Sequence, residues 1–306
     1  MHLFAQIEPV QSSDQELKAL EVHRVSTYYF SSLDTSNFDG QLILEKEFDD
    51  LGKITKKHIL SLWEAVSYSN TTTFSYDNND QLIETTTIQT ILNLNQRDDE
   101  YITAYGDTPL HETVRFAYNS DGQLLKKEMF TFSTPELPKN AIPVQTILYG
   151  YEDNRLMLEE STSPNKGIFN QTYTIDYVYD VKGNLSRKTM RHGTELKNKK
   201  ITEYWYDDTD RLIEEKITDS GVPRNNGHFK YEYDQAGLVK NKWIFDAVTA
   251  DFVVDTNYTY DSKGNMTSGE RDVVFEYNEH GLIQTELWRD AISDQVFYFV
   301  SNYTYQ

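Results

Sequence analysis

Apolar and polar residues alternate along much of this chain, in short segments that end at turn-forming residues. In "YTIDYVYD", Tyr173, Ile175, Tyr177 and Tyr179 occupy every second position. Because residues two apart share one face of a strand, this period predicts half-buried β-strands with one aromatic face and one face toward water. No apolar segment approaches the roughly 20 residues that a membrane helix needs.

One phrase recurs nine times along the chain. Its copies are EFDDLGKI at 47, FSYDNNDQL at 74, FAYNSDGQL at 116, YGYEDNRL at 149, YVYDVKGNL at 177, YWYDDTDRL at 204, YEYDQAGL at 231, YTYDSKGNM at 258 and FEYNEHGL at 275, and YTYQ at 303 begins a tenth. Most copies are about 27 residues apart, which accommodates two strands and two turns. We therefore predict an all-β fold, an antiparallel meander of about ten hairpins forming one large curved, spiral or barrel-like sheet.

Each part of the phrase has a physical role in a hairpin. The acidic or Asn residue after the second aromatic suits the first position of a type I turn, and a later position needs positive φ to close the turn with a bulge. Where this later position lacks Gly it holds Asp or Asn, which tolerate the left-handed region best. Its occupants are Gly52, Asp80, Gly122, Asn154, Gly183, Asp210, Gly237, Gly264 and Gly281. We assign these nine residues a structural role in turns.

The N-terminal part of the chain departs from the repeat. The segment SSDQELKALEV at 12–22 predicts a short helix, with a possible capping box between Ser13 and Glu16. Residues 1–46 are therefore expected to form an N-terminal segment with this helix and the first strands, followed by the repeat sheet at 47–306. No linker separates the two, so we expect one structural domain overall.

Composition narrows the possible partners. The formal net charge is −20, with 49 acidic and 29 basic residues, which argues against nucleic acid as a partner because phosphate binding needs clustered Lys and Arg. The chain has no cysteine, which excludes disulfides and thiolate metal sites. The non-core strand positions include Lys230, Glu232 and Glu276 rather than a lipid-facing apolar band, so no membrane insertion is expected.

No catalytic or cofactor signature appears. The seven histidines are scattered without a metal-binding spacing. Adjacent acidic pairs point to opposite faces of a strand, and turn geometry already accounts for many acidic residues. We expect no enzymatic activity and no cofactor. Turn acids leave Ca²⁺ possible, although their spacing matches no known calcium loop.

The tryptophans indicate a binding surface more selectively than the histidines and acidic residues do. Trp205 lies between Tyr204 and Tyr206, so it is expected on the face opposite the aromatic one, where an exposed indole can stack on a sugar ring or a partner side chain. Trp243 and Trp288 lie in returning strands and are further candidates for ligand binding. Packing within the sheet is the alternative interpretation for both, and for Trp63.

The phrase resembles the YD repeat, also called the RHS repeat, of bacterial surface and polymorphic-toxin proteins. YDVKGNL at 179–185 and YDSKGNM at 260–266 match the family phrase Tyr-Asp-x-x-Gly-x-Leu well, and the resemblance covers about residues 47–306. It implies a long sheet of hairpins, which forms hollow shells around a toxin domain in large relatives. Simpler relatives are called wall-associated or carbohydrate-binding. This chain departs from the toxin type because it is short and has no Asp-Pro autocleavage segment near its C-terminus.

These observations favour a non-enzymatic, exported repeat protein that binds a surface ligand, either glycan or protein, through the sheet. The expected location is the periplasm, the cell surface or the medium, and the start MHLFAQ is compatible with the end of a secretory signal. Two alternatives remain open: a structural or assembly component of a bacterial surface or secretion complex, and a fragment of an Rhs-type shell.

Overall fold

The computed structural model describes residues 14–30, 41–62, 66–94, 109–134, 136–164, 172–193, 198–269, 273–289 and 296–305. Its contacts divide the chain into two compact units. Unit 1 comprises residues 1–114, 131–140 and 260–306, and unit 2 comprises residues 115–130 and 141–259. This division leaves the expectation of a single structural domain untested, so it stays a prediction.

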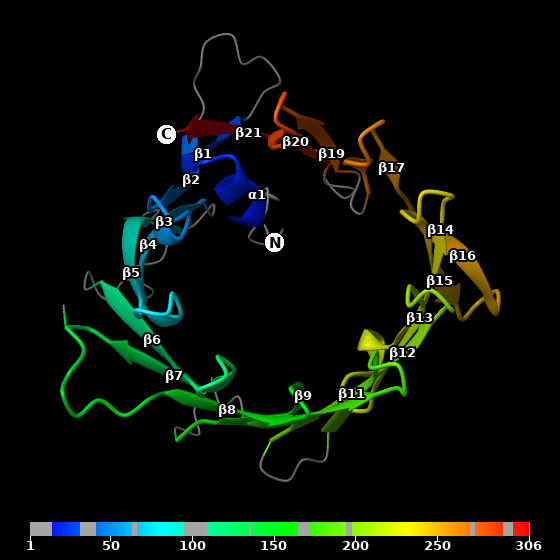
Figure 1. Ribbon diagram of the computed structural model, residues 1–306, viewed down its shortest axis with the longest axis horizontal. Helices are drawn as coiled ribbons and strands as arrows, with labels where there is room; N and C mark the ends of the chain where they lie inside the picture. The colour runs from blue at the N-terminus through cyan, green and yellow to red at the C-terminus, as the bar shows by residue number, and fades with distance from the viewer. Residues whose placement is uncertain are drawn as a thin grey trace. The chain divides into compact units, whose positions relative to one another are not determined.

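Unit 2 is a meander in which consecutive strands pair antiparallel along a curve (Figure 1). Its strands are β7 (Leu124–Phe132, which ends in unit 1), β8 (Gln145–Glu152), β9 (Arg155–Thr162), β10 (Tyr173–Tyr179), β11 (Leu185–His192), β12 (Asn198–Tyr206), β13 (Leu212–Asp219), β14 (Gly227–Tyr233), β15 (Val239–Asp246) and β16 (Asp251–Asn257). A short 3-10 helix, η1 (Pro223–Asn225), connects β13 to β14. The meander follows from the repeat, because each phrase closes one hairpin.

Unit 1 contains both ends of the described chain. Its elements are α1 (Asp14–Ala19), β1 (Val22–Phe30), β2 (Gln41–Phe48), β3 (Ile54–Leu62), β4 (Val66–Tyr76), β5 (Leu82–Leu94), the start of β6 (Leu110–Tyr118), the end of β17 (Thr259–Tyr260), β18 (Met266–Ser268), β19 (Val274–Tyr277), β20 (Ile283–Arg289) and β21 (Val296–Tyr305). Strand β1 pairs with β2 on one side and with the last strand, β21, on the other. The all-β antiparallel meander with a short N-terminal helix is thus confirmed, while Ser13 of the expected capping box lies outside the described residues.

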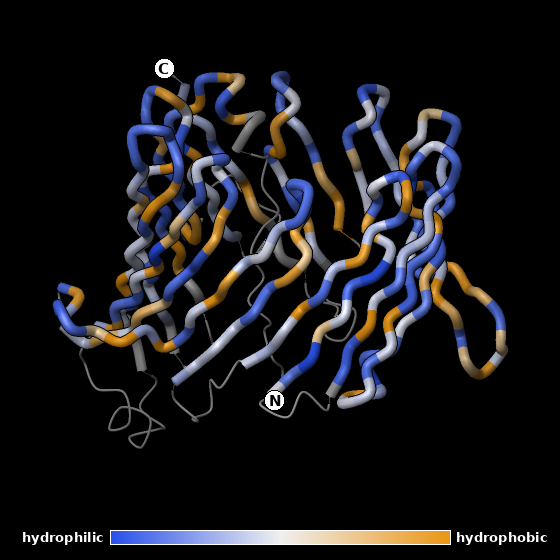
Figure 2. The backbone as a smooth tube through the Cα atoms, turned by 60° about the horizontal axis from the view of Figure 1, so that its bottom comes forward, coloured by the Kyte–Doolittle hydropathy of each residue, from blue (hydrophilic) through white to orange (hydrophobic). Residues whose placement is uncertain are grey.

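Hydrophilic and hydrophobic residues are interspersed along the strands (Figure 2), and the two faces of the strands differ as the alternation predicts. The residue between the two aromatics of a phrase is exposed in seven copies: Ser75, Ala117, Val178, Trp205, Glu232, Thr259 and Glu276. The flanking aromatics are half-buried or, as at Phe48 and Phe275, buried. The residue at the middle position can therefore change from copy to copy without disturbing the aromatic face.

Eight of the nine phrase turns share one geometry, and the fourth copy has a tighter turn in which Asp153 and Asn154 both have positive φ. In the turn of β10 and β11, the Asp180 carboxylate accepts hydrogen bonds from the backbone N–H groups of Lys182 (2.9 Å) and Asn184 (2.8 Å). The N–H of Gly183 donates to the Asp180 carbonyl at 3.1 Å. All nine residues assigned to the closing position have positive φ, from 62° at Asn154 to 99° at Gly183. The positive φ therefore favours glycine at Gly183, where a Cβ would also displace the guanidinium of Arg155, 2.6 Å away.

The three non-glycine residues at this position share a further contact. Each accepts a hydrogen bond from the turn of the preceding hairpin: Asp80 from Lys53 at 2.7 Å, Asn154 from Gln123 at 3.4 Å, and Asp210 from Asn184 at 2.9 Å and Lys182 at 3.1 Å. The side chain therefore links neighbouring turns where glycine cannot.

A bulge follows the second aromatic in most hairpins. The register shifts between Trp205 and Tyr206, so that Tyr206 pairs with Leu212 and Trp205 pairs with Glu214, and Ile213 is the extra residue. Equivalent shifts occur at Glu47/Phe48, Ser75/Tyr76, Gly150/Tyr151, Val178/Tyr179, Glu232/Tyr233 and Glu276/Tyr277. The bulge explains why two apolar residues stand together after a turn although one face is apolar.

The second aromatic also joins hairpins through its hydroxyl. Tyr233 donates to the carbonyl of Leu212 at 2.6 Å, the apolar residue that follows the preceding turn. The same bond joins Tyr76 to Ile54, Tyr179 to Leu156, Tyr206 to Leu185 and Tyr277 to Met266. In the last unit the first aromatic, Tyr303, donates to the carbonyl of Ile283 instead. The copy at residue 47 has Phe48 instead, which has no hydroxyl to donate. The hydroxyl thus accounts for the preference for Tyr at this position.

The three clusters of buried apolar residues in the described chain all lie in unit 1. One joins Leu17 of α1 to Val22 and Val25 of β1, with Phe48 and Leu282. In unit 2 the aromatic face is only half-buried, and its polar groups bond within the sheet. Tyr173 and Tyr177, for example, both donate to Glu159, at 2.6 and 3.3 Å. Unit 2 is therefore stabilised largely by strand pairing and by side-chain bonds between neighbouring strands.

Candidate functional site

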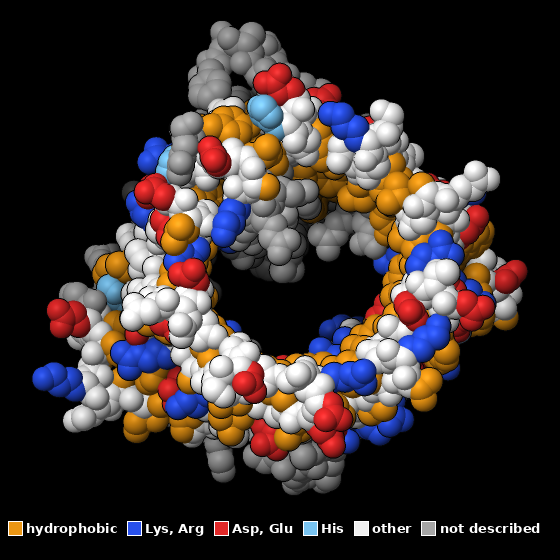
Figure 3. Space-filling view, in the orientation of Figure 1, with side chains coloured by type: hydrophobic (Ala, Val, Ile, Leu, Met, Phe, Trp, Pro, Cys, Tyr) orange, Lys and Arg blue, Asp and Glu red, His pale blue; other side chains and the backbone are white. Residues whose placement is uncertain are grey.

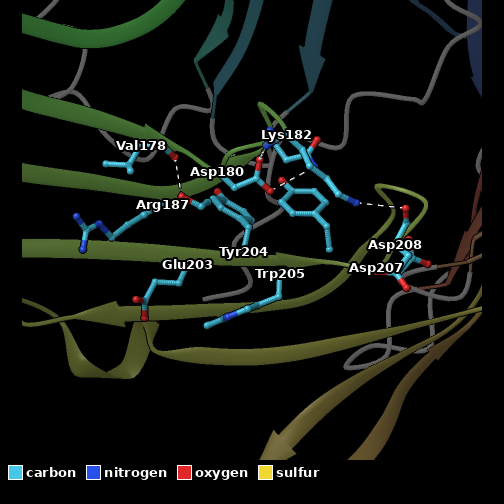
Figure 4. A pocket seen from close by; sticks show the side chains of 12 residues that line it. Val178, Asp180, Lys182, Arg187, Glu203, Tyr204, Trp205, Asp207 and Asp208 are labelled. Carbon is cyan, nitrogen blue, oxygen red and sulfur yellow. Dashed lines mark hydrogen bonds between the residues drawn. The ribbon is translucent and has the colours of Figure 1, made fainter.

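The indole of Trp205 is the exposed aromatic ring that the sequence predicts. Strand β12 sends Tyr204 to the aromatic face and Trp205 to the opposite face (Figure 4). Tyr206 shares the face of Tyr204 because it lies two residues further along the strand. Its exposed fraction is 41%, large for an aromatic side chain within a sheet. This exposure leaves part of the indole accessible for stacking.

A shallow groove surrounds Trp205, with a volume of about 610 Å³. Strand register brings Val178 of β10, Arg187 of β11 and Glu203 of β12 into one row across its floor. Among the described residues, neither the Arg187 guanidinium nor the Glu203 carboxylate makes a side-chain hydrogen bond or ion pair. An aromatic ring thus lies beside one unpaired donor and one unpaired acceptor, the combination that polar ligands with a flat apolar face require.

The turn end of the groove is held by hydrogen bonds. Lys182 donates to the carbonyl of Asp208 at 3.3 Å (Figure 4), and it also donates to the Asp210 carboxylate at 3.1 Å. The bond to Asp210 is the main reason that the pKa of Lys182 is raised. The backbone N–H of Arg211 and the hydroxyl of Thr209 hold the pKa of Asp207 well below its usual value, because they donate to its ionised form. These groups form a fixed rim rather than a reactive site.

The structure places the other two candidate tryptophans differently. Trp243 of β15 lies in unit 2 on the same face as Trp205, because the pairs Trp205–Glu214, Glu214–Lys230 and Lys230–Trp243 continue one row across β12 to β15. Trp288 lies in unit 1, where it packs against two buried clusters and its indole N–H donates to Glu286. Register therefore brings Trp205 and Trp243 together in one row and leaves Trp288 in a different unit.

Sequence reasoning missed several residues beside Trp243. The imidazole Nε2 of His228 lies 2.5 Å from the Glu214 carboxylate, its ring contacts Phe252 edge-on at 4.9 Å, and the ammonium of Lys230 lies 4.1 Å above the same ring. The alternation in HFKYEY places His228 and Lys230 on the face opposite the aromatic one. Only the strand register shows that Phe252 reaches the same cluster.

Charged side chains of both signs are interspersed over the strands of unit 2 (Figure 3). Within the described part of the chain, no three His, Asp or Glu side chains lie close enough together to hold a metal ion. The turn carboxylates bond backbone N–H groups instead, as at Asp180 and Asp261. No described helix is long and apolar enough to cross a membrane.

Comparisons with known proteins give only remote similarity. No family model matches the chain, and no curated protein matches it. Among solved structures, the Tc holotoxin pore of Photorhabdus luminescens is 14% identical, with a TM-score of 0.37, over 89% of this chain and 17% of that one. A porin-like protein from Bacteroides uniformis is 11% identical, with a TM-score of 0.41, over 93% of this chain and 98% of that one.

A TcdB2–TccC3 structure is 13% identical, with a TM-score of 0.31, over 94% of this chain and 15% of that one. The chain thus spans less than a fifth of the length of these two toxin chains. At this level the similarities assign neither a family nor a function, and membership of the YD-repeat family stays a prediction.

Proposed function

We propose that this protein is a non-enzymatic, exported binding protein, and that a surface glycan docks in the groove around Trp205. The observation that carries the proposal is the exposed indole beside Arg187 and Glu203, neither of which has a side-chain partner among the described residues. A sugar ring offers an apolar face for the indole and hydroxyls for both charged groups. A protein partner could use the same surface, and it is the alternative outcome of the experiment below.

A structural or assembly role is the second candidate. It is favoured by the number of phrase residues used to join hairpins, such as the Tyr233 hydroxyl and the Asp210 carboxylate. This role would explain the scaffold but leaves the exposed Trp205 without a purpose. We therefore rank it below ligand binding.

The test is affinity electrophoresis of the purified protein in gels containing laminarin, xylan, dextran, mannan or pectin. We expect selective retardation by at least one of them, and its loss in Trp205→Thr. Threonine occupies the same phrase position at Thr259, and its β-propensity is high, so the sheet should persist.

The matched control is Glu276→Thr, which changes the same position in another copy of the phrase. It should be retarded as strongly as the parent protein. Retardation that persists in Trp205→Thr would place the ligand elsewhere. No retardation by any of the polysaccharides would contradict glycan binding and direct attention to a protein partner.

A further inference from the structure

The face of unit 2 opposite the aromatic one, called the outer face from here on, carries two tryptophans in one cross-strand row. Trp205 pairs with Glu214, Glu214 with Lys230, and Lys230 with Trp243. Paired residues in antiparallel strands project from the same face. The row therefore runs perpendicular to β12, β13, β14 and β15 and has an indole at each end.

The distance between the indoles follows from strand geometry. Three strand spacings of about 4.8 Å separate Trp205 from Trp243, or about 14 Å in total. A single sugar ring cannot span this distance, but a linear chain of several rings can. The row and the groove are continuous, because Trp205 belongs to both.

The residues between the indoles supply polar groups. Glu214 is held by His228, and the ammonium of Lys230 lies over the Phe252 ring. Within the described part of the chain Lys230 has no hydrogen-bonded or ion-paired partner. One donor and one acceptor thus lie in fixed positions midway along the row.

The charges along this surface balance. Arg187, Lys216 and Lys230 on this face offset Glu203, Glu214 and Glu232, on a chain whose net charge is −20. A surface that is locally neutral but rich in donors and acceptors complements an uncharged polyhydroxyl chain better than a basic peptide or a polyanion.

The indole of Trp243 is half-buried within the sheet. Glu232 on the neighbouring strand is held by hydrogen bonds from Lys240 (3.3 Å) and Asn241 (2.6 Å). A partly buried ring stacks on a ligand with little loss of side-chain entropy.

We propose that the row from Trp205 to Trp243 is an extended track for a linear, uncharged oligosaccharide, with one ring stacked on each indole. This inference rests on the proposed function, since it assigns a ligand length and a second stacking residue to the same site. The predicted signature is an affinity that depends on chain length.

The experiment uses size-fractionated fragments, from disaccharide upward, of the polysaccharide that retards the parent protein most strongly. Calorimetric titration should show affinity rising with fragment length until a fragment spans both indoles. In Trp243→Thr we expect the disaccharide to bind as it does to the parent, and long fragments to bind about fivefold to tenfold more weakly, as loss of one stacking contact implies.

The matched control is Leu148→Thr, which removes an exposed apolar side chain from β8, outside both the row and the groove. It should retain the length dependence of the parent. Trp243→Phe keeps an aromatic ring. If Trp243→Thr is folded but binds long fragments weakly, Trp243→Phe should recover most of the affinity for these fragments.

The failure of the track can be distinguished from the failure of the glycan site at Trp205. If Trp205→Thr loses binding at every length while Trp243→Thr matches the parent at every length, the track is wrong and the Trp205 site stands. If no polysaccharide retards the parent protein, both proposals fail together.

Discussion

The phenolic hydroxyl of the second aromatic residue shows how a single group can account for a repeated sequence choice. In five of the described hairpins it donates to a backbone carbonyl of the preceding unit. The bond satisfies an acceptor on the half-buried face, where an unpaired carbonyl is costly. Phenylalanine supplies the same ring without this bond, and it occurs at this position only in the first copy, as Phe48.

The turn carboxylates make a second prediction at the residue scale. Hydrogen bonds from Arg211 and Thr209 lower the pKa of Asp207 in the folded protein. The stability from this group is therefore present above the unfolded pKa of about 3.9 and is lost as pH falls below it. Asp207→Asn should flatten the fall in stability below about pH 4, measured by urea unfolding at several pH values.

Asparagine is a suitable replacement because Asn119 accepts the same two backbone hydrogen bonds in its own turn, at 3.0 and 2.9 Å. Asp208→Asn is the control, since it removes a charge from the same turn without touching these bonds. An unchanged pH slope in Asp207→Asn would show that the turn carboxylate does not contribute to acid sensitivity.

At the scale of the element, the hairpin depends on its closing residue and on the neighbouring turn. Asp210 has a φ of 63° and accepts hydrogen bonds from Lys182 and Asn184. Substitutions can separate the effect of the positive φ from that of the hydrogen bonds. Glycine at this position keeps the backbone geometry, and asparagine also keeps a side-chain acceptor.

We expect the stability order parent, Asp210→Asn, Asp210→Gly, Asp210→Ala, measured by chemical unfolding. Alanine loses the inter-turn bonds and must also hold positive φ, which costs about 1–2 kcal/mol in an L-residue. Asn154 shows that asparagine is accepted at the same position of another copy. Equal stability of the alanine and glycine variants would contradict the role given to the backbone conformation.

The sequence predicts the hairpins well because the decisive information is local. The order Asp180, Gly183 and Leu185 determines a turn, a positive φ and the start of a strand within a few residues. The inward face of the returning strand in RLIEEK is not predictable in the same way. A bulge at Ile213 shifts the alternation by one residue, and a bulge is a property of two paired strands rather than of one.

The candidate site likewise has a part that local sequence predicts and a part that depends on strand pairing. The exposure of Trp205 follows from its place between two aromatics of the phrase. Its alignment with Trp243 depends on the registers of β12 to β15 together. The packing of Trp288 likewise depends on Phe299 and Phe275, which are distant from each other in sequence. Sequence therefore identifies single candidates, while the grouping of candidates is a property of the sheet.

At the scale of the whole molecule, the two faces of the sheet have separate tasks. Aromatic positions such as Tyr233 join hairpins, and the middle positions vary from Ser75 to Trp205. This division predicts that outer-face substitutions change binding with little effect on folding. A long repeat sheet can then carry different ligand surfaces on one scaffold.

The most direct test of this division compares the thermal unfolding of Trp205→Thr and Tyr233→Phe. Tyr233→Phe removes one hydrogen bond, worth about 0.5–1.5 kcal/mol, and should lower the midpoint by about 2–4 °C for each kcal/mol lost. Trp205→Thr should stay within about 0.5 kcal/mol of the parent, as surface substitutions do. If Trp205→Thr unfolds at a temperature as low as that of Tyr233→Phe or lower, Trp205 belongs to the scaffold and the separation of the two faces is wrong.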